Sequence, residues 1–404
     1  MSCHSSSSSS EEEYDSDEPP QLELDLQKLM DSATLALKTP CHGVKRLTRG
    51  SNHEIFVLSF DISETAPESL RRAGFSCIAR AAREAGQTAR DESEIVSARY
   101  VRRHTKIPVP EIYHYDLDPD NDVGAPYSLM ERLPGKHLYK IWDALSLDHK
   151  KVALSQIANV IVQLAGLKFD KIGSLFESGI GPVVHPCHRR REGPFSTTLD
   201  YLRSFASTDG IASPDLKRVL LEVQAELGRF FASTDDAVYL QPPFAFVHAD
   251  LDGQNILFVP SEDGSGPVLS GLIDFENAYT GPLEFLYKYP IFIQDVCWSE
   301  HLYAENKILR AHFVRAVHDI LAETEAQRTF IDCMNSKSYA LNRFREAFML
   351  IICTEEVQQE LAEEYVETMR DWTGLAYNGT VDYVPELYTD AGDPAPPRLE
   401  EDSG

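Results

Sequence analysis

The sequence predicts an α+β protein in which a small, mostly antiparallel sheet precedes a larger, mostly helical region. Up to residue 131, short apolar and β-branched runs alternate with turn residues, which is typical of strands. From residue 148 onward, apolar residues recur at helical spacing instead. With 404 residues, the chain is long enough for two lobes with substantial cores.

The first forty residues divide into a tail and a helix. Residues 1–20 hold six consecutive serines, an acidic run and two prolines, so we expect them to be disordered. Ser16, which lies among acidic residues, is a candidate for phosphorylation, and a purely solubilising tail is the alternative. Residues 21–41 predict an amphipathic helix that ends at Pro40, with these apolar positions on one face: Leu26, Leu29, Met30, Ala33 and Leu37.

Residues 42–132 are expected to form the small lobe, an antiparallel sheet with one helix. Pro108 and Pro110 end the helix, which covers about 91–104. A turn at Gly50-Ser51-Asn52 joins the first two strands into a hairpin. The expected strands are 44–47, 55–60, 75–80, 112–115 and 127–131.

Residues 133–385 are expected to form the larger lobe. Helices are predicted after Asp148, after Ser213, whose hydroxyl suits an N-cap, and over the acidic stretch 301–372. Residues 177–200 predict a loop-rich stretch. It contains His185 and His188, which we interpret as loop residues rather than metal ligands, because no further ligand lies close in sequence. Residues 386–404 predict a second disordered acidic tail.

Composition excludes several classes of protein. A net charge of -26 without a basic stripe argues against a nucleic-acid-binding surface and disfavours docking on anionic membranes. The seven cysteines are scattered and never form a C-x-x-C spacing, which fits reduced thiols. No apolar run reaches the length of a membrane-spanning helix. We therefore expect a soluble, cytoplasmic protein.

The most informative stretch is 244–258, followed by 271–276. Two buried strands are predicted around a polar loop that holds His248, Asp250 and Asn255, and a third strand ends on Asp274. This spacing reproduces the phosphoryl-transfer pattern H-x-D-x-x-x-x-N…D-F. In that chemistry Asp250 accepts the proton of the attacking hydroxyl, and Asn255 and Asp274 hold the magnesium ion that bridges the nucleotide phosphates. Taken singly, His248 could instead be a core histidine and Asp274 a cap.

Together with residues 107–115, 129–136, 169–175 and 281–286, this stretch resembles the aminoglycoside phosphotransferase-like family, and more narrowly its fungal branch. The resemblance covers about residues 42–300. It implies a bilobal protein-kinase-like fold, with a small antiparallel-sheet N-lobe, a larger mostly helical C-lobe and the active site in the interlobe cleft. It also implies transfer of the γ-phosphoryl group of ATP, or of GTP, to a hydroxyl group of a small molecule.

The resemblance further implies roles for individual residues. The turn Gly50-Ser51-Asn52 would lie over the nucleotide phosphates, and His248 would brace the catalytic loop. Arg80 replaces the strand lysine of kinases as the phosphate anchor, with Glu94 as its carboxylate partner. Arg83 and Glu92 are the alternatives for these two roles. At the hinge, the backbone of Met130 and Glu131 would bind the base, so the sequence does not distinguish adenine from guanine.

Two other functions stay open at this stage. The chain could be a nucleotide-binding or interaction protein of the same fold that has lost catalysis, because Arg80 and the glycine-poor turn at Gly50 depart from the kinase pattern. A protein kinase ranks lower, because the sequence has no G-x-G-x-x-G loop and no A-P-E segment. The residues do not identify the acceptor.

Overall fold

The structure is a computed structural model that describes residues 20–62, 68–71, 74–83, 88–184, 192–233, 240–294, 299–334, 344, 348 and 354–371. The chain forms two compact units. The first contains Met1–Thr88 and Ile112–Arg132, and the second contains Ala89–Glu111 and Leu133–Gly404. The two tails predicted to be disordered, 1–20 and 386–404, lie outside the described residues except for Pro20. The candidate phosphorylation site Ser16 and the histidines at 185 and 188 also lie outside them.

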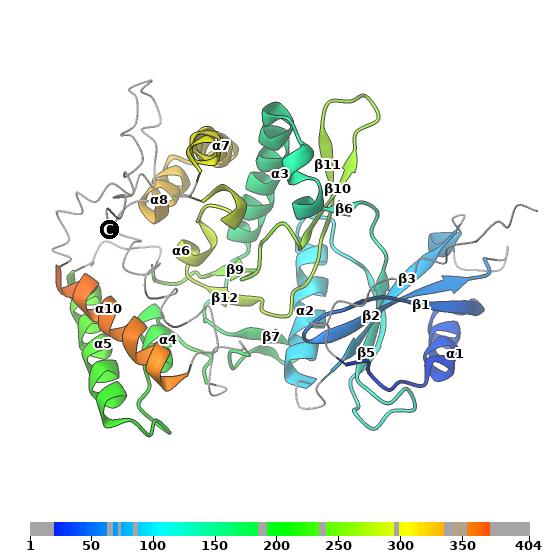
Figure 1. Cartoon of the computed structure of the whole chain (residues 1–404), viewed down its shortest axis with the longest axis horizontal. Coiled ribbons are helices and arrows are strands. Elements are labelled where there is room, and N and C mark those ends of the chain that lie inside the picture. Colours follow the sequence, from blue (N-terminus) through cyan, green and yellow to red (C-terminus); the bar gives the residue numbers. More distant parts are fainter. Residues whose placement is uncertain are drawn as a thin grey trace, which may run out of the picture. The chain divides into compact units, whose positions relative to one another are not determined.

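A five-stranded antiparallel sheet forms the first unit (Figure 1). Its strands lie in the order β1-β2-β3-β5-β4. The predicted hairpin is confirmed, since β1 and β2 pair antiparallel on either side of Gly50–Asn52. The strand bounds are β1 Cys41–Arg49, β2 His53–Phe60, β3 Ser76–Ala82, β4 Ile112–Asp116 and β5 Tyr127–Glu131.

Helix α1 (Leu26–Leu37) covers this sheet and matches the helix predicted from the sequence. Asp25 caps it, because its carboxylate accepts a hydrogen bond from Lys28 N at 3.0 Å. The buried face of α1 packs into the apolar core of the unit. That core includes Leu29, Ala33, Leu37, Phe56, Leu58, Phe75, Cys77 and Leu129.

Long helices dominate the second unit, as the change to helical periodicity indicated (Figure 1). Two of them begin with serine N-caps, of which the sequence predicted Ser213. Ser146 Oγ accepts from His149 N at 3.2 Å, and Ser213 Oγ accepts from Leu216 N at 3.2 Å. The helix bounds are α2 Thr88–His104, α3 Leu147–Gly166, α4 Thr198–Phe205, α5 Pro214–Ser233, α6 Leu283–Leu286, α7 Glu300–Ile320, α8 Thr324–Met334 and α10 Glu355–Asp371.

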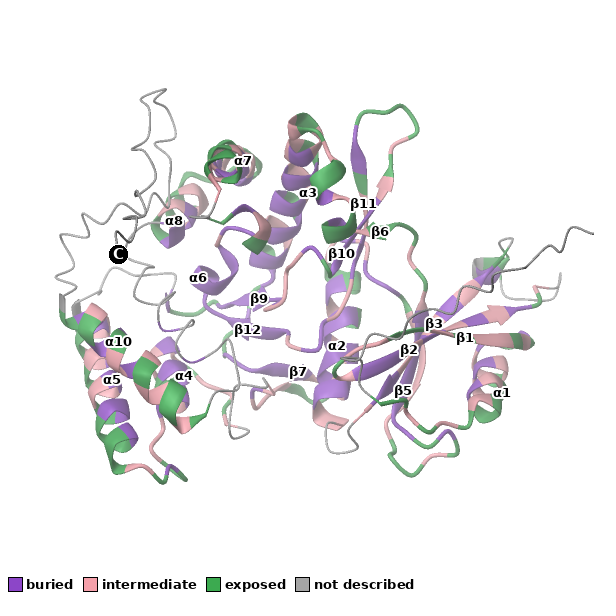
Figure 2. Ribbon diagram, in the orientation of Figure 1, coloured by how far each residue is buried: buried purple, intermediate pink, exposed green. Residues whose placement is uncertain are grey.

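Short strands complete the second unit and carry its functional loops. β6 (Lys136–His137), β10 (Ile256–Pro260) and β11 (Pro267–Leu272) form one sheet. β9 (Ala245–Val247) pairs with β12 (Tyr279–Gly281), and β7 (Ser174–Phe176) pairs with β8 (Gly179–Gly181). Figure 2 shows β9 and β12 as buried, so the loops beside them start from fixed ends.

The sequence did not predict several of these elements. β6, β7, β8, β12, α4 and α6 are two to eight residues long, which is too short to show a period in the sequence. The stretch expected to be loop-rich, 177–200, contains β8 and the start of α4. Its tertiary partners, not its own pattern, select these elements.

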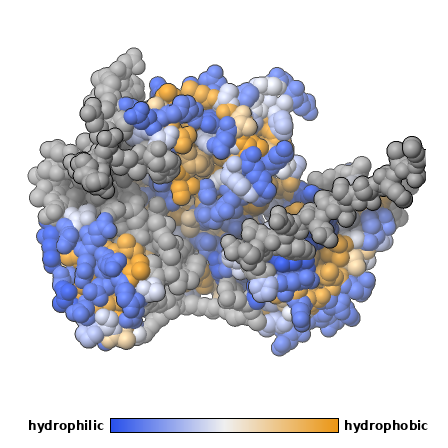
Figure 3. Space-filling model, in the orientation of Figure 1, coloured by the Kyte–Doolittle hydropathy of each residue, from blue (hydrophilic) through white to orange (hydrophobic). Residues whose placement is uncertain are grey.

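On the face shown in Figure 3, the described residues are mostly hydrophilic, with apolar side chains gathered in several patches. Among the helices that the structure describes, none is both long enough and apolar enough to span a bilayer. Cys41, Cys77 and Cys333 are free thiols, as the scattered cysteine pattern predicted for these three.

Candidate active site

The loop between β9 and β10 holds the residues of the phosphoryl-transfer pattern. Its backbone is closed by two turn hydrogen bonds, from Asp252 N to Asp250 O at 3.0 Å and from Asn255 N to Asp252 O at 2.9 Å. Gly253 allows a close approach to the chain after β6, because a Cβ there would lie 3.1 Å from Tyr139 N. Tyr139 N also donates to Gly253 O at 3.1 Å. The loop is therefore held by hydrogen bonds within its own backbone and by a hydrogen bond to Tyr139.

Asp250 and Asn255 are in direct contact. The Asn255 amide donates from Nδ2 to the Asp250 carboxylate at 2.8 Å and to the Asp250 carbonyl at 2.9 Å. Asn255 is buried and Asp250 is half-buried. This contact orients the Asp250 carboxylate, and it leaves the amide oxygen of Asn255 as the atom that can act as a ligand.

Asp274 follows β11 in a left-handed backbone conformation, with φ of 67°. The residue before it is bonded to the loop between β9 and β10, because Ile273 N donates to Asn255 O at 3.0 Å. Ala249, beside Asp250, has φ of 66°. Among the described non-glycine residues, the only other positive φ is at Lys38. Such conformations cost about 1 kcal/mol each and persist where the surroundings fix them.

His248 is buried and braces this arrangement. Its Nε2 donates to the carbonyl of Ile273 at 3.1 Å, and its ring lies 4.8 Å from the ring of Phe275 between centroids. Burial lowers the pKa of His248 to about 4, and the nearby negative charge of Asp274 only partly opposes that shift. A neutral His248 therefore joins the loop between β9 and β10 to the segment that carries Asp274.

The site concentrates negative charge around Asp250. Burial raises the pKa of Asp250, and the charges of Asp274, Asp252 and Glu276 raise it further, whereas the hydrogen bond from Asn255 lowers it. Carboxylates held this close repel one another unless a cation lies among them. Oxygen donors in such a cluster match the ligand preference of Mg²⁺.

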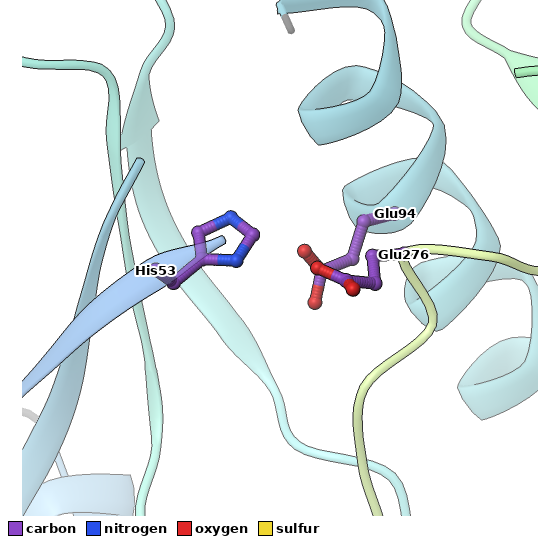
Figure 4. Close-up of side chains that lie close together, drawn as sticks. All are labelled: His53, Glu94 and Glu276. Atoms are coloured by element: carbon purple, nitrogen blue, oxygen red, sulfur yellow. The ribbon is translucent and has the colours of Figure 1, made fainter. Parts of the chain in front are cut away.

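Arg90 and Glu276 extend the site beyond the residues that the sequence singled out. Arg90 Nη2 donates to Glu276 Oε1 at 2.8 Å and to Asn277 Oδ1 at 2.9 Å. Glu94, one turn along α2 from Arg90, places a carboxylate oxygen within 4.8 Å of one from Glu276. Figure 4 shows the carboxylates of Glu94 and Glu276 lying together. The signal for Arg90 was available, since it precedes Glu94 by four residues on one helix face.

In the first unit, the turn Gly50-Ser51-Asn52 is tightly held. Gly50 N donates to His53 O at 2.8 Å, and Arg83 N donates to Asn52 O at 3.0 Å. Arg80, on β3, places Nη2 3.0 Å from His53 Nδ1. Met130 and Glu131 end β5, where Met130 stands opposite both Ile78 and Ile112.

Arg83 and Glu92, the alternatives for the phosphate anchor and its carboxylate partner, form hydrogen bonds with other groups. The guanidinium of Arg83 donates to Gly50 O, Pro20 O and the Glu54 carboxylate. Glu92 Oε1 accepts from Glu177 N at 3.3 Å. Arg80 lies in the first unit and Glu94 in the second, and their pairing stays a prediction.

Residues 71–285, more than half of the chain, match the model of the phosphotransferase enzyme family. The chain belongs to this family. The match includes Arg80, the loop between β9 and β10 and the Asp274 segment. The α+β architecture predicted from the sequence is confirmed, with an antiparallel-sheet unit and a mostly helical unit.

This phosphotransferase-family chain is similar to curated fungal proteins over shorter stretches. It is 36% identical over 86 residues to a subtelomeric hrmA-associated cluster protein of Aspergillus fumigatus, covering 21% of this chain and 17% of that protein. It is 27% identical over 180 residues to altered inheritance of mitochondria protein 9 of Candida tropicalis, covering 43% of this chain and 25% of that protein. The chain thus spans a quarter or less of these relatives' lengths.

The chain is also similar to solved structures of aminoglycoside phosphotransferases. One is a thermostable mutant of APH(4)-Ia in a ternary complex with ADP and hygromycin B, with a TM-score of 0.46 and 17% identity over 84% of this chain and 98% of that one. The other is the gentamicin complex of APH(2")-IIa, with a TM-score of 0.48 and 14% identity over 87% of this chain and 97% of that one.

Proposed function

We propose that this phosphotransferase moves the γ-phosphoryl group of ATP, or of GTP, to a hydroxyl group of a small molecule, with Mg²⁺ as cofactor. The observation that carries the proposal is the contact between Asn255 and Asp250 within a loop fixed by His248 and Ile273. A carboxylate oriented in this way suits a general base, and the amide that orients it suits a metal ligand.

Asp250 is the proposed base. Its half-buried carboxylate can accept the proton of an acceptor hydroxyl as the oxygen attacks the γ-phosphorus. The pKa of Asp250 is raised by burial and by neighbouring carboxylates, and a higher pKa makes the carboxylate a stronger base. Asn255 holds the carboxylate in one orientation, which supplies the positioning on which phosphoryl transfer depends.

Asn255 and Asp274 are the proposed magnesium ligands. The residues fit the ion because oxygen donors predominate and negative charge accumulates around Asp250. Asp274 is held on its N-terminal side by the bond from Ile273 N to Asn255 O, which joins the two ligand positions. When bound, Mg²⁺ would neutralise charge on the nucleotide phosphates.

The first unit would bind the nucleotide. Ser51 is exposed at the tip of the β1–β2 turn, where backbone amides can approach phosphate oxygens. Arg80, positioned by Glu94, is the proposed phosphate anchor. The backbone of Met130 and Glu131 is proposed to bind the base.

Asp250→Asn tests the mechanism, with Asp252→Asn as its matched control. Both variants remove one negative charge from the same loop, but only the first removes the proposed proton acceptor. We expect Asp250→Asn to lower phosphoryl transfer by about a hundredfold or more and to retain MgATP binding. Asp252→Asn should lower transfer by less than about tenfold.

Acceptors would be found by incubating the parent protein with MgATP and a pooled set of small hydroxyl compounds. Undiminished transfer by Asp250→Asn would overturn the role of Asp250. If the parent binds MgATP and transfers phosphate to none of the pool, the result favours a nucleotide-binding protein that lacks catalysis.

A further inference from the structure

Glu54 is a fully buried carboxylate in the first unit, and three groups surround it. It lies on β2 with 0% exposure. Its Oε1 accepts from Arg46 Nε at 2.5 Å, and its Oε2 accepts from Arg83 Nη2 at 3.2 Å. Leu22 N donates to the same Oε2 at 2.8 Å. A buried carboxylate is stable only when it is paired and hydrogen-bonded in this way.

Arg83 connects this carboxylate to the turn between β1 and β2. Its Nε donates to Gly50 O at 2.8 Å and its Nη1 donates to Pro20 O at 2.6 Å, while the backbone N donates to Asn52 O at 3.0 Å. The side chain of Arg83 is 10% exposed. One guanidinium therefore joins the Gly50–Asn52 turn, the Glu54 carboxylate and the chain segment before α1.

These bonds determine which way the turn presents its backbone. The peptide between Gly50 and Ser51 is trans and planar, so its carbonyl and its N–H point in opposite directions. Because Arg83 holds the Gly50 carbonyl, the N–H of Ser51 must point away from Arg83. Ser51 is itself exposed, so an anion can approach this residue of the turn from solvent.

We propose that Arg83 is a positioning residue for the phosphate-binding turn Gly50–Asn52, and that Pro20–Leu22 belongs to the same hydrogen-bond network. This inference rests on the nucleotide role proposed above for the turn. Glu54 holds the guanidinium of Arg83, Arg83 holds the Gly50 carbonyl, and the segment Pro20–Leu22 engages both partners through one carbonyl and one N–H. Charge-assisted hydrogen bonds of this kind are short and directional, so they restrict the turn before nucleotide arrives.

The chain offers a matched control. Arg46 is the second arginine on Glu54, but it contacts the ring of Phe56 and no bond from it to the turn is present among the described residues. Arg83→Met and Arg46→Met each remove one cation from the same buried carboxylate. Both variants should lower the melting temperature, and only Arg83→Met should make the backbone of the Gly50–Asn52 turn less ordered.

Two readouts separate the inference from the proposed function. The first is amide hydrogen exchange of the peptide that covers Gly50–Asn52, measured without nucleotide. The second is the dissociation constant for MgATP. We expect Arg83→Met to exchange about tenfold faster in this peptide and to bind MgATP about tenfold more weakly, whereas Arg46→Met should match the parent in both. Arg83→Lys, which keeps the charge but not the planar fork, should fall between Arg83→Met and the parent, and it serves if Arg83→Met does not fold.

Equal exchange of the turn in Arg83→Met and Arg46→Met would overturn the positioning role. Faster exchange with unchanged MgATP affinity would show that Arg83 orders the turn and that the turn does not bind phosphate. If the parent itself does not bind MgATP, the proposed function fails, and the exchange comparison still decides whether Arg83 positions the turn.

A pair of truncations tests the segment before α1. Removal of residues 1–18 leaves Pro20 and Leu22 in place, so exchange of the turn and MgATP affinity should match the full chain. Removal of residues 1–22 deletes the Pro20 carbonyl and the Leu22 N–H. The exchange rate of the turn and the MgATP affinity should then shift toward the values of Arg83→Met. Equal exchange rates and equal MgATP affinities in the two truncations would show that Pro20–Leu22 does not position the turn.

Discussion

Arg90 on α2 donates a hydrogen bond from Nη2 to Oε1 of Glu276, two residues after Asp274, at 2.8 Å. The same nitrogen donates to Asn277 Oδ1 at 2.9 Å. The side chains of Arg90 and Glu276 are each 10% exposed, so solvent screens this ion pair little. On its other side, the Asp274 segment is held by the bond from Ile273 N to Asn255 O. Asp274 thus sits in a segment fixed at both ends, which is what a strained backbone requires.

Arg90→Met is therefore predicted to impair metal use rather than folding alone. We expect the Mg²⁺ concentration for half-maximal nucleotide binding to rise by about tenfold, because the Asp274 segment loses its C-terminal tether. Arg99→Met is the control, since Arg99 lies on the same helix and pairs with Glu177 at a more exposed position. An unchanged Mg²⁺ requirement in Arg90→Met would show that the tether does not position Asp274.

Replacement of Asp274 separates its chemistry from its backbone strain. Both Asp274→Ala and Asp274→Gly remove the carboxylate, so Mg²⁺ should no longer tighten nucleotide binding in either variant. Glycine adopts a φ of 67° without strain and alanine does not, so Asp274→Gly should be more stable than Asp274→Ala by about 1 kcal/mol. Calorimetric titration with and without Mg²⁺, and urea unfolding, measure the two effects. Mg²⁺-dependent tightening that survives in both variants would refute the metal assignment.

Gly135→Ala is predicted to be strongly destabilising. Gly135 has φ of 114°, and a Cβ there would lie 2.5 Å from Ser270 Oγ and 2.6 Å from Phe258 O. Strain and overlap together should lower the free energy of unfolding by about 3 kcal/mol. Gly166→Ala, at the end of α3 with nothing near its Cβ, should instead be neutral or raise it by about 0.5 kcal/mol. Urea unfolding compares the two, and equal stability would contradict the close approach at Gly135.

His312 is predicted to make the packing of α7 on α3 depend on pH. Its Nε2 lies 2.9 Å from Ser155 Oγ and 3.0 Å from Lys151 O. Burial lowers the pKa of His312 from its ordinary value of 6.5, and the positive charges of Arg315 and Lys151 lower it further, while the Lys151 carbonyl opposes the shift.

Because the folded state disfavours the charged imidazole, the contribution of His312 is complete above the unfolded pKa of 6.5 and is lost as pH falls below it. His312→Gln keeps a polar side chain that does not titrate. From about pH 8 to about pH 5.5 its melting temperature should fall less than that of the parent. Parallel melting curves would show that His312 does not contribute.

The sequence alone predicted most of the longer elements and placed Asp250, Asn255 and Asp274 at the spacing of the phosphoryl-transfer pattern. The helix at 26–37, the hairpin around Gly50–Asn52 and the strands beside Asp250 and Asp274 follow from local periodicity and turn residues, which act over a few neighbouring positions. The sequence likewise placed Asp250 and Asn255 in one loop, and the structure adds the hydrogen bond between their side chains.

Only the tertiary structure decided which charged residues meet across long separations. Arg90 and Glu276 are 186 positions apart, and Arg83 and Pro20 are 63 apart, so no local pattern could pair them. The contacts of Arg83 are likewise tertiary, whereas the role of Arg80 as phosphate anchor stays a prediction. Arg83 donates hydrogen bonds to Glu54 and to the Gly50 carbonyl. The fold buries the Glu54 carboxylate, and a buried charge is stable only when charged or hydrogen-bonding partners lie beside it, however far apart they are in the sequence.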